Sequence, residues 1–101
     1  MRERDIERHL VKCVKHLGGE VRKVEWIGRR GAPDRLVMLP NWGGQIITVY
    51  GMQVPNQIWV ELKAPGVPAE DYQLREHARM RALGQRVEVI DSIEAVESLL
   101  S

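Results

Sequence analysis

Three features that often assign a protein to a class are scarce in this sequence: cysteine, long apolar runs and net charge. The single cysteine, Cys13, excludes an internal disulfide framework and fits a reducing cytosol. No apolar run approaches the length of a membrane span, and the dense charge from Arg2 to Arg8 argues against a signal peptide. We therefore expect a cytoplasmic protein without a membrane partner. Because the net charge is only +1, any nucleic-acid binding must come from a local patch.

The composition that is present is that of a globular protein. The chain has 101 residues, of which 44% are hydrophobic and 29% charged, with no repeats, low-complexity segments or linker. We expect a single domain over residues 1–101. A domain of this size buries somewhat over ~60% of its unfolded surface, so oligomerisation is a plausible further source of stability.

Two short β-prone runs carry the residues around which the sequence is organised. Residues 34–39 begin with Asp34, and residues 58–63 contain Glu61 and Lys63. Strand alternation puts Glu61 and Lys63 on one face and leaves the apolar residues of the second run on the other, where they can be buried. If the two runs pair as neighbouring strands, Asp34 comes near Glu61.

Two carboxylates held close together are costly unless a cation lies between them. Mg²⁺ suits such a pair, because it takes hard oxygen ligands and keeps several of its own waters. A water acidified by the metal and oriented by Lys63 would be a nucleophile for phosphodiester hydrolysis. A lysine beside two acids keeps its proton, so we expect orientation rather than deprotonation.

The longer motif series resembles a known nuclease family. Arg-Arg-Gly-Ala-Pro-Asp-Arg-Leu at 29–36 is followed by Glu-Leu-Lys-Ala-Pro-Gly at 61–66, then by Gln73, which opens a helix ending at Leu83-Gly84. This order is similar to the virus-type replication-repair nuclease (VRR-NUC) domain of the PD-(D/E)XK superfamily, over nearly the whole chain except residues 41–57. The resemblance implies a restriction-endonuclease-like α/β fold and a DNA endonuclease dependent on Mg²⁺ or Mn²⁺.

The resemblance also implies roles for individual residues. The catalytic set would be Asp34, Glu61, Lys63 and Gln73, with Gln73 helping to hold the water or the phosphate. The metal would be bound by Asp34, Glu61 and the backbone carbonyl of Leu62. Such nucleases also carry a first-helix glutamate that faces the metal. Of the two candidates Glu7 is the better match and Glu3 the reserve; without the resemblance both are surface acids.

Three arginines crowd the approach to Asp34. Arg29, Arg30 and Arg35 are either solvated surface or, beside a metal site, phosphate ligands that form forked hydrogen bonds. His77 lies one turn after Gln73 on the same helix face and is a further candidate DNA contact.

The first helix offers a different metal chemistry. His9, Cys13 and His16 fall on adjacent turns of one face, at usable spacing for a metal. No fourth ligand is evident, and Cys13 belongs to the apolar stripe of the helix. A small buried cysteine with two surface histidines is therefore the preferred interpretation.

The hydrophobic pattern predicts the order αβββαβα, a mixed α/β sandwich with a central sheet flanked by helices. We expect helices over 3–17 and 70–83 and a short helix after Asp91 or Ser92. The core strands are expected at 20–26, 34–39, 58–63 and 86–90. The β-prone segment 46–50 is extra: it is either a contact in a homodimer or an edge strand packed on its own core.

The resemblance, with the apolar segment 46–50 as a candidate dimer contact, implies a homodimeric resolvase of four-way (Holliday) DNA junctions. The resemblance alone implies that a bacterial virus or prophage encodes it. Two active sites related by a two-fold axis suit a symmetric junction. One alternative is a nuclease of flapped, nicked or linear DNA. The other is a dimeric DNA-binding module whose acids form only structural ion pairs.

Overall fold

The computed structural model describes residues 1–40, 48–49, 52–53 and 56–100. Within these ranges the chain forms helices and strands in the order αβββββαβα. The helices are α1 (Glu3–His16), α2 (Asp71–Ala82) and α3 (Ile93–Leu100). The strands are β1 (Glu20–Lys23), β2 (Arg35–Met38), β3 (Thr48–Val49), β4 (Met52–Gln53), β5 (Gln57–Leu62) and β6 (Val87–Ile90).

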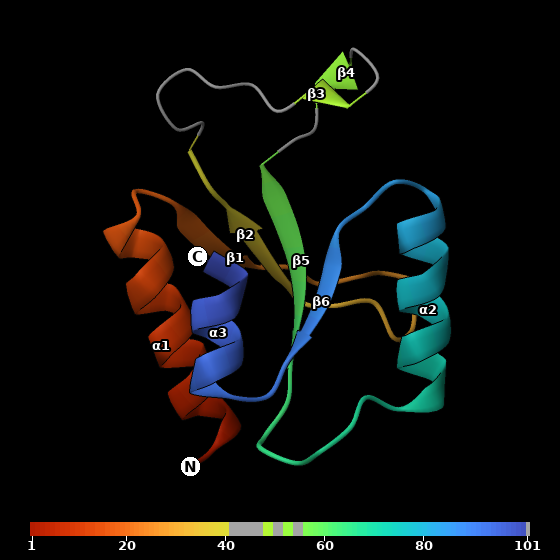
Figure 1. Cartoon of the computed structure of the whole chain (residues 1–101). Helices are drawn as coiled ribbons and strands as arrows, with labels where there is room; N and C mark the ends of the chain where they lie inside the picture. The colour runs from red at the N-terminus through yellow and green to blue at the C-terminus, as the bar shows by residue number, and fades with distance from the viewer. Residues whose placement is uncertain (41–47, 50–51, 54–55, 101) are drawn as a thin grey trace.

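A four-stranded mixed sheet in the order β1-β2-β5-β6 forms the centre of the molecule. The pairs β1–β2 and β2–β5 are antiparallel, and β5–β6 is parallel. A parallel pair requires a crossover, and α2 provides it. Helices α1 and α3 lie side by side on one face of the sheet, and α2 lies on the other face (Figure 1). The short strands β3 and β4 pair with each other in a separate antiparallel sheet.

The core lies between the sheet and the α1–α3 pair. The spacing of apolar residues along each helix and strand explains which residues belong to it. Ile6, Leu10 and Val14 recur at helical spacing on α1 and are fully buried. Ile58 and Val60 occupy alternate positions of β5 and face the same core. The other buried members of this cluster are Val37, Leu62, Ile90 and Val96.

The predicted fold class is confirmed. The ends of the core strands differ from the predicted ones by at most one residue, except in the first strand. The first strand ends at Lys23 rather than at Trp26. Trp26 leaves the ladder because its indole Nε1 donates to the Pro33 carbonyl (2.8 Å) and its ring packs against Trp59, 5.1 Å between centroids. Of the predicted strand 46–50 only Thr48 and Val49 are described, so its interpretation as a dimer contact lies outside the described residues. None of the helices in the described ranges has the length and hydrophobicity needed to cross a membrane.

Candidate active site

The pairing of β2 with β5 brings the two predicted acidic residues together. Arg35 is the register partner of Val60, so the residues just outside this pair, Asp34 and Glu61, lie opposite each other. Across an antiparallel pair, opposite residues are close neighbours. The charge of Asp34 accordingly acts on the Glu61 carboxyl. Two carboxylates therefore face each other at the end of the sheet where β5 ends and β2 begins.

Glu61 is more enclosed than strand alternation alone suggests. Its face of β5 is covered by α2, and only 8% of the residue is exposed. The pKa of Glu61 is raised from 4.5 to about 7, chiefly because burial disfavours its charged form. The charges of Asp34 and Glu3 also raise this pKa, whereas Lys63 and Arg35 lower it. The surroundings of Glu61 thus disfavour its ionised form, which a nearby cation would stabilise.

The backbone carbonyl of Leu62 lies beside this pair and lacks the donor that a continued ladder would supply. Continued past its first residues, the β2–β5 register sets Pro33 opposite Leu62. In β2 and its extensions at both ends, the odd-numbered residues turn their N–H toward β5. Leu39, for example, donates to the Asn56 carbonyl (2.9 Å). Proline has no N–H, so Pro33 cannot donate a hydrogen bond to the Leu62 carbonyl as another residue at this position would.

The two acids of α1 and the nearest arginine are arranged differently from the sequence-based preference. The guanidinium of Arg35 pairs with Glu7 and, at 2.9 Å between Nη1 and Oδ1, with Asp34. The Arg35 side chain is 13% exposed, so it is held by these two acids rather than open to a phosphate. Glu7 is therefore committed to Arg35, and Glu3 is the first-helix acid whose charge acts on Glu61.

The arginine loop, residues 28–33, is fastened to α2 by a residue that the sequence analysis did not single out. The carboxylate of Glu76 is buried and accepts from Arg29 (2.7 Å) and from Arg79 (2.9 Å). Both arginines remain about half exposed. Arg30 stacks its guanidinium over the ring of Tyr72, 4.1 Å from the centroid. The loop thus presents Arg29 and Arg30 on a rigid support.

The same loop touches the start of α2 at Gly31. Its φ of +88° is one that glycine adopts without strain, and a Cβ added there would lie 2.8 Å from the Tyr72 carbonyl oxygen. Gly28 has a similar φ of +72° but open space around it. Substituting each glycine by alanine therefore separates two costs: the strain of a positive φ, which both share, and the steric clash with α2, which only Gly31 has.

We expect Gly31→Ala to destabilise the protein by about 1 kcal/mol more than Gly28→Ala, which should itself cost roughly 1–2 kcal/mol for its left-handed backbone. The additional cost arises because the new methyl group must push the loop away from α2. Urea unfolding of both variants measures the difference. Equal destabilisation would show that the loop adapts without disturbing α2.

The remaining two predicted residues lie on α2, and one prediction needs correction. Gln73 lies in the first turn, where its Oε1 accepts from the Glu70 backbone N–H (2.8 Å). His77, a candidate DNA contact, is completely buried behind Glu61, with 3.3 Å between His77 Nε2 and Glu61 Oε1. Burial and the neighbouring charges of Arg81 and Lys63 lower the pKa of His77. A side chain without exposed surface cannot bind DNA.

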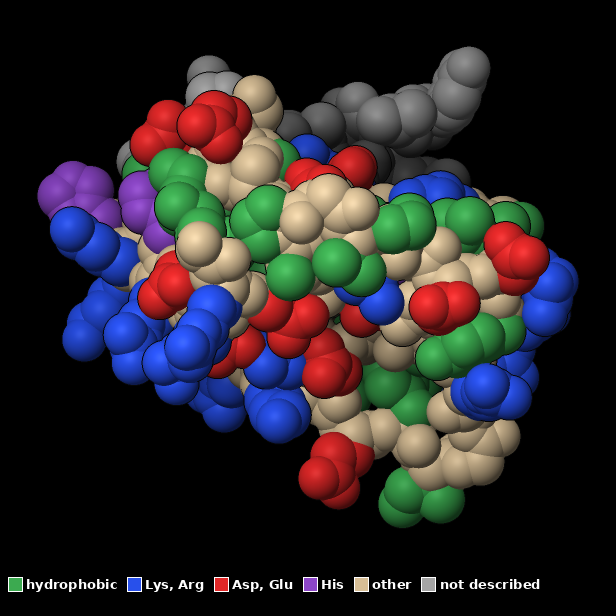
Figure 2. Space-filling view, turned by 90° about the horizontal axis from the view of Figure 1, so that it is seen from below, with side chains coloured by type: hydrophobic (Ala, Val, Ile, Leu, Met, Phe, Trp, Pro, Cys, Tyr) green, Lys and Arg blue, Asp and Glu red, His purple; other side chains and the backbone are tan. Residues whose placement is uncertain are grey.

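Seen from below, the face that holds the ends of the sheet strands has acidic side chains near its middle, bordered by Lys and Arg side chains (Figure 2). Within the described ranges, no three His, Cys, Asp or Glu side chains converge closely enough to hold a metal ion. The candidate site accordingly consists of two facing carboxylates, a backbone carbonyl and the neighbouring lysine. The carboxylate and carbonyl oxygens are hard donors of the kind that Mg²⁺ or Mn²⁺ takes.

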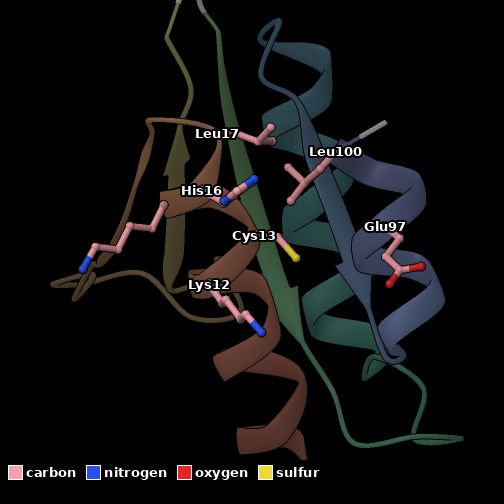
Figure 3. Close-up of a pocket in the computed structure, with 7 residues that line it drawn as sticks. Lys12, Cys13, His16, Leu17, Glu97 and Leu100 are labelled. Carbon is pink, nitrogen blue, oxygen red and sulfur yellow. The ribbon is translucent and has the colours of Figure 1, made fainter.

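The absence of a three-ligand cluster in the described ranges also argues against a metal site formed by His9, Cys13 and His16. His9 Nε2 lies 3.4 Å from both Cys13 Sγ and Glu97 Oε1, and Cys13 is partly buried against the core. Cys13 and Glu97 border an open cavity of about 660 Å³ between α1 and α3 (Figure 3). The residues that line it are Lys12, Cys13, Lys15, His16, Leu17, Glu97 and Leu100. None of them belongs to the carboxylate site.

Comparison with known proteins decides the family. No protein-family model matches the chain. The chain is 51% identical, over 92 residues, to a phage protein named "Putative nuclease p44", from Acyrthosiphon pisum secondary endosymbiont phage 1. The alignment covers 91% of this chain and 85% of that protein. A solved structure named "VRR_NUC domain" is 34% identical and matches with a TM-score of 0.75, over 97% of this chain and 92% of the other.

The chain belongs to the VRR-NUC family. This confirms the resemblance that the motif series indicated, and the fold of the VRR-NUC structure confirms the mixed sheet with three helices. The roles of the individual residues of this VRR-NUC domain stay predictions.

Proposed function

We propose that this VRR-NUC nuclease is a Mg²⁺- or Mn²⁺-dependent DNA endonuclease that resolves four-way junctions as a homodimer. The observation that carries the proposal is the facing pair Asp34 and Glu61, with Glu61 buried and its pKa raised to about 7. A buried carboxyl opposite a second acid is stabilised in its ionised form by a divalent cation. Surface ion pairs alone would give no reason to bury it.

The cation would be held by Asp34, Glu61 and the Leu62 carbonyl, which Pro33 leaves without its ladder donor. Glu3, whose charge reaches Glu61, is the first-helix acid that we favour to complete the site. When bound, a divalent cation acidifies water and neutralises charge on the phosphate. Lys63 adjoins Glu61 and orients the attacking water, while Gln73 holds the water or the phosphate.

The DNA backbone would be bound by the arginine loop. Arg29 and Arg30 are held on α2 by Glu76 and Tyr72, and a guanidinium fixed in this way loses little freedom when it takes a phosphate. Arg35 is occupied by Glu7 and Asp34, so we assign it to holding the carboxylate site together.

The junction specificity rests on symmetry rather than on a contact. A four-way junction has two opposed strands to cut, and a two-fold dimer presents two sites related in the same way. A phage protein of this kind acts in the cytoplasm of the bacterial host, where branched DNA arises during replication and recombination.

The test is cleavage of end-labelled DNA by the purified protein with Mg²⁺ or Mn²⁺. An immobile four-way junction, a flap and a linear duplex are compared, with Asp34→Ala as the inactive control. We expect paired, symmetric cuts in the junction, absent in the control, and a dimeric mass in sedimentation. Cutting of flap or duplex with the junction spared would remove the resolvase assignment. Folded protein that cuts nothing would favour a DNA-binding module.

A further inference from the structure

His77 is a buried polar residue that the proposed mechanism does not use. It is 0% exposed, and its one polar contact among the described residues is Nε2 to Glu61 Oε1, at 3.3 Å. The other ring nitrogen, Nδ1, is buried without a hydrogen-bond partner in the same part of the chain. Buried polar groups are usually paired, so an imidazole with one free nitrogen needs an explanation.

The free nitrogen indicates where the proton lies. A neutral imidazole carries one N–H, on either nitrogen. With the proton on Nδ1, a donor would be buried unpaired, which is the rarer and more costly arrangement. With the proton on Nε2, the ring donates to Glu61 and leaves only a lone pair at Nδ1. The contact is therefore a donation from His77 Nε2–H to the Glu61 carboxylate.

Such a bond has a geometric effect on Glu61. The two oxygens of a carboxylate diverge, so a donor fixed at Oε1 determines where Oε2 points. His77 has no exposed surface on α2, so its ring has little room to turn. The imidazole is thus a rigid support behind the acid that faces Asp34.

We infer that His77 is a positioning residue, which orients the ionised Glu61 carboxylate for the divalent cation by donating from Nε2. The inference rests on the proposed function, since it concerns a ligand of the proposed metal site. Outer hydrogen-bond partners of metal ligands typically change metal affinity or activity by about 10–100-fold when they are removed.

Three substitutions separate hydrogen bonding from packing. Glutamine places an amide N–H near the position of Nε2, asparagine places one near Nδ1, and leucine has no donor. Mn²⁺ binding to EDTA-treated protein is measured by isothermal titration calorimetry. We expect His77→Leu and His77→Asn to weaken binding by about 10-fold or more, and His77→Gln to restore it to within about threefold of wild type.

The result that overturns the inference is equal Mn²⁺ affinity in His77→Leu and wild type, or equal loss in all three folded variants. Wild-type protein that binds no Mn²⁺ overturns the proposed function and this inference together. The ring nitrogens of wild-type His77 provide a readout that needs neither metal nor variant. Their ¹⁵N shifts should report a proton on Nε2, and a proton on Nδ1 alone would contradict the assignment.

Discussion

Glu61→Gln is expected to make the metal-free protein more stable at pH 8 while abolishing its activity. The gain arises because wild-type Glu61 must ionise at pH 8 in a site that is only 8% exposed. The difference between its ordinary pKa of 4.5 and about 7 in the fold corresponds to roughly 3 kcal/mol at about 1.4 kcal/mol per unit. Glutamine avoids this cost and can still accept the bond from His77.

The sign of the pH dependence follows from proton binding. Below about pH 4.5 Glu61 is protonated in both states, so its raised pKa costs nothing. Between about 4.5 and 7 the unfolded chain loses this proton while the folded protein keeps it. The free energy of unfolding therefore falls as pH rises through this window and levels off above it. The titratable group in contact with Glu61 is the neutral His77. The charges that act on Glu61 are those of Lys63, Asp34, Glu3 and Arg35.

The measurement is urea unfolding of the EDTA-treated protein between pH 5 and 8. The gap between Glu61→Gln and wild type should widen with pH, and DNA cleavage should fall by about 10³-fold or more, beyond the loss expected for an outer partner. Glu76→Gln is the matched control. Glu76 is also buried, but its pKa is lowered by Arg29 and then Arg79, so the loss of its charge should destabilise the protein. A Glu61→Gln variant less stable than wild type at pH 8 would contradict the account.

Lys63→Met is expected to reduce cleavage by about 10²–10⁴-fold, the usual contribution of a group that positions or transfers a proton. A second effect follows from charge. Lys63 lowers the pKa of Glu61, so its removal raises that pKa further. Metal binding requires ionised Glu61, and the pH at which Mn²⁺ binding is half complete should move upward.

Lys63→Arg separates these two effects. It keeps the charge, so the pH midpoint of Mn²⁺ binding should stay near that of wild type while the cleavage rate is still reduced. Lys12→Met removes a charge from the far side of the sheet and should change neither quantity. Wild-type cleavage by Lys63→Met would exclude a catalytic role for this lysine.

Much of the fold could be predicted because its elements have clear periods. Alternation along β5 places Ile58, Val60 and Leu62 on its buried face, and helical spacing does the same for Ile6, Leu10 and Val14 on α1. The closeness of Asp34 and Glu61 could also be predicted, because pairing the two short strands as neighbours brings these residues together. Local sequence is sufficient when a side chain's partner lies on the next strand.

The rest of the site depends on α2, and the sequence does not say which face of the sheet α2 covers. Because α2 packs over Glu61, a residue expected on a polar surface becomes buried, and His77 becomes its partner instead of a DNA contact. Glu76 could have been linked to Arg79 by their helical spacing. Its bond to Arg29, 47 positions away, has no local signal.

The pairing of β2 with β5 also governs when the nuclease can become active during synthesis. A ribosome releases Asp34 well before Glu61, and the strand that unites them is followed by α2, which encloses Glu61. A nascent chain that has emerged only through β2 has one carboxylate and no second acid opposite it. Because non-local strand pairing is slow compared with helix formation, the two acids meet late. If the facing pair is catalytic as proposed, an unfinished chain is expected not to cut the DNA around it.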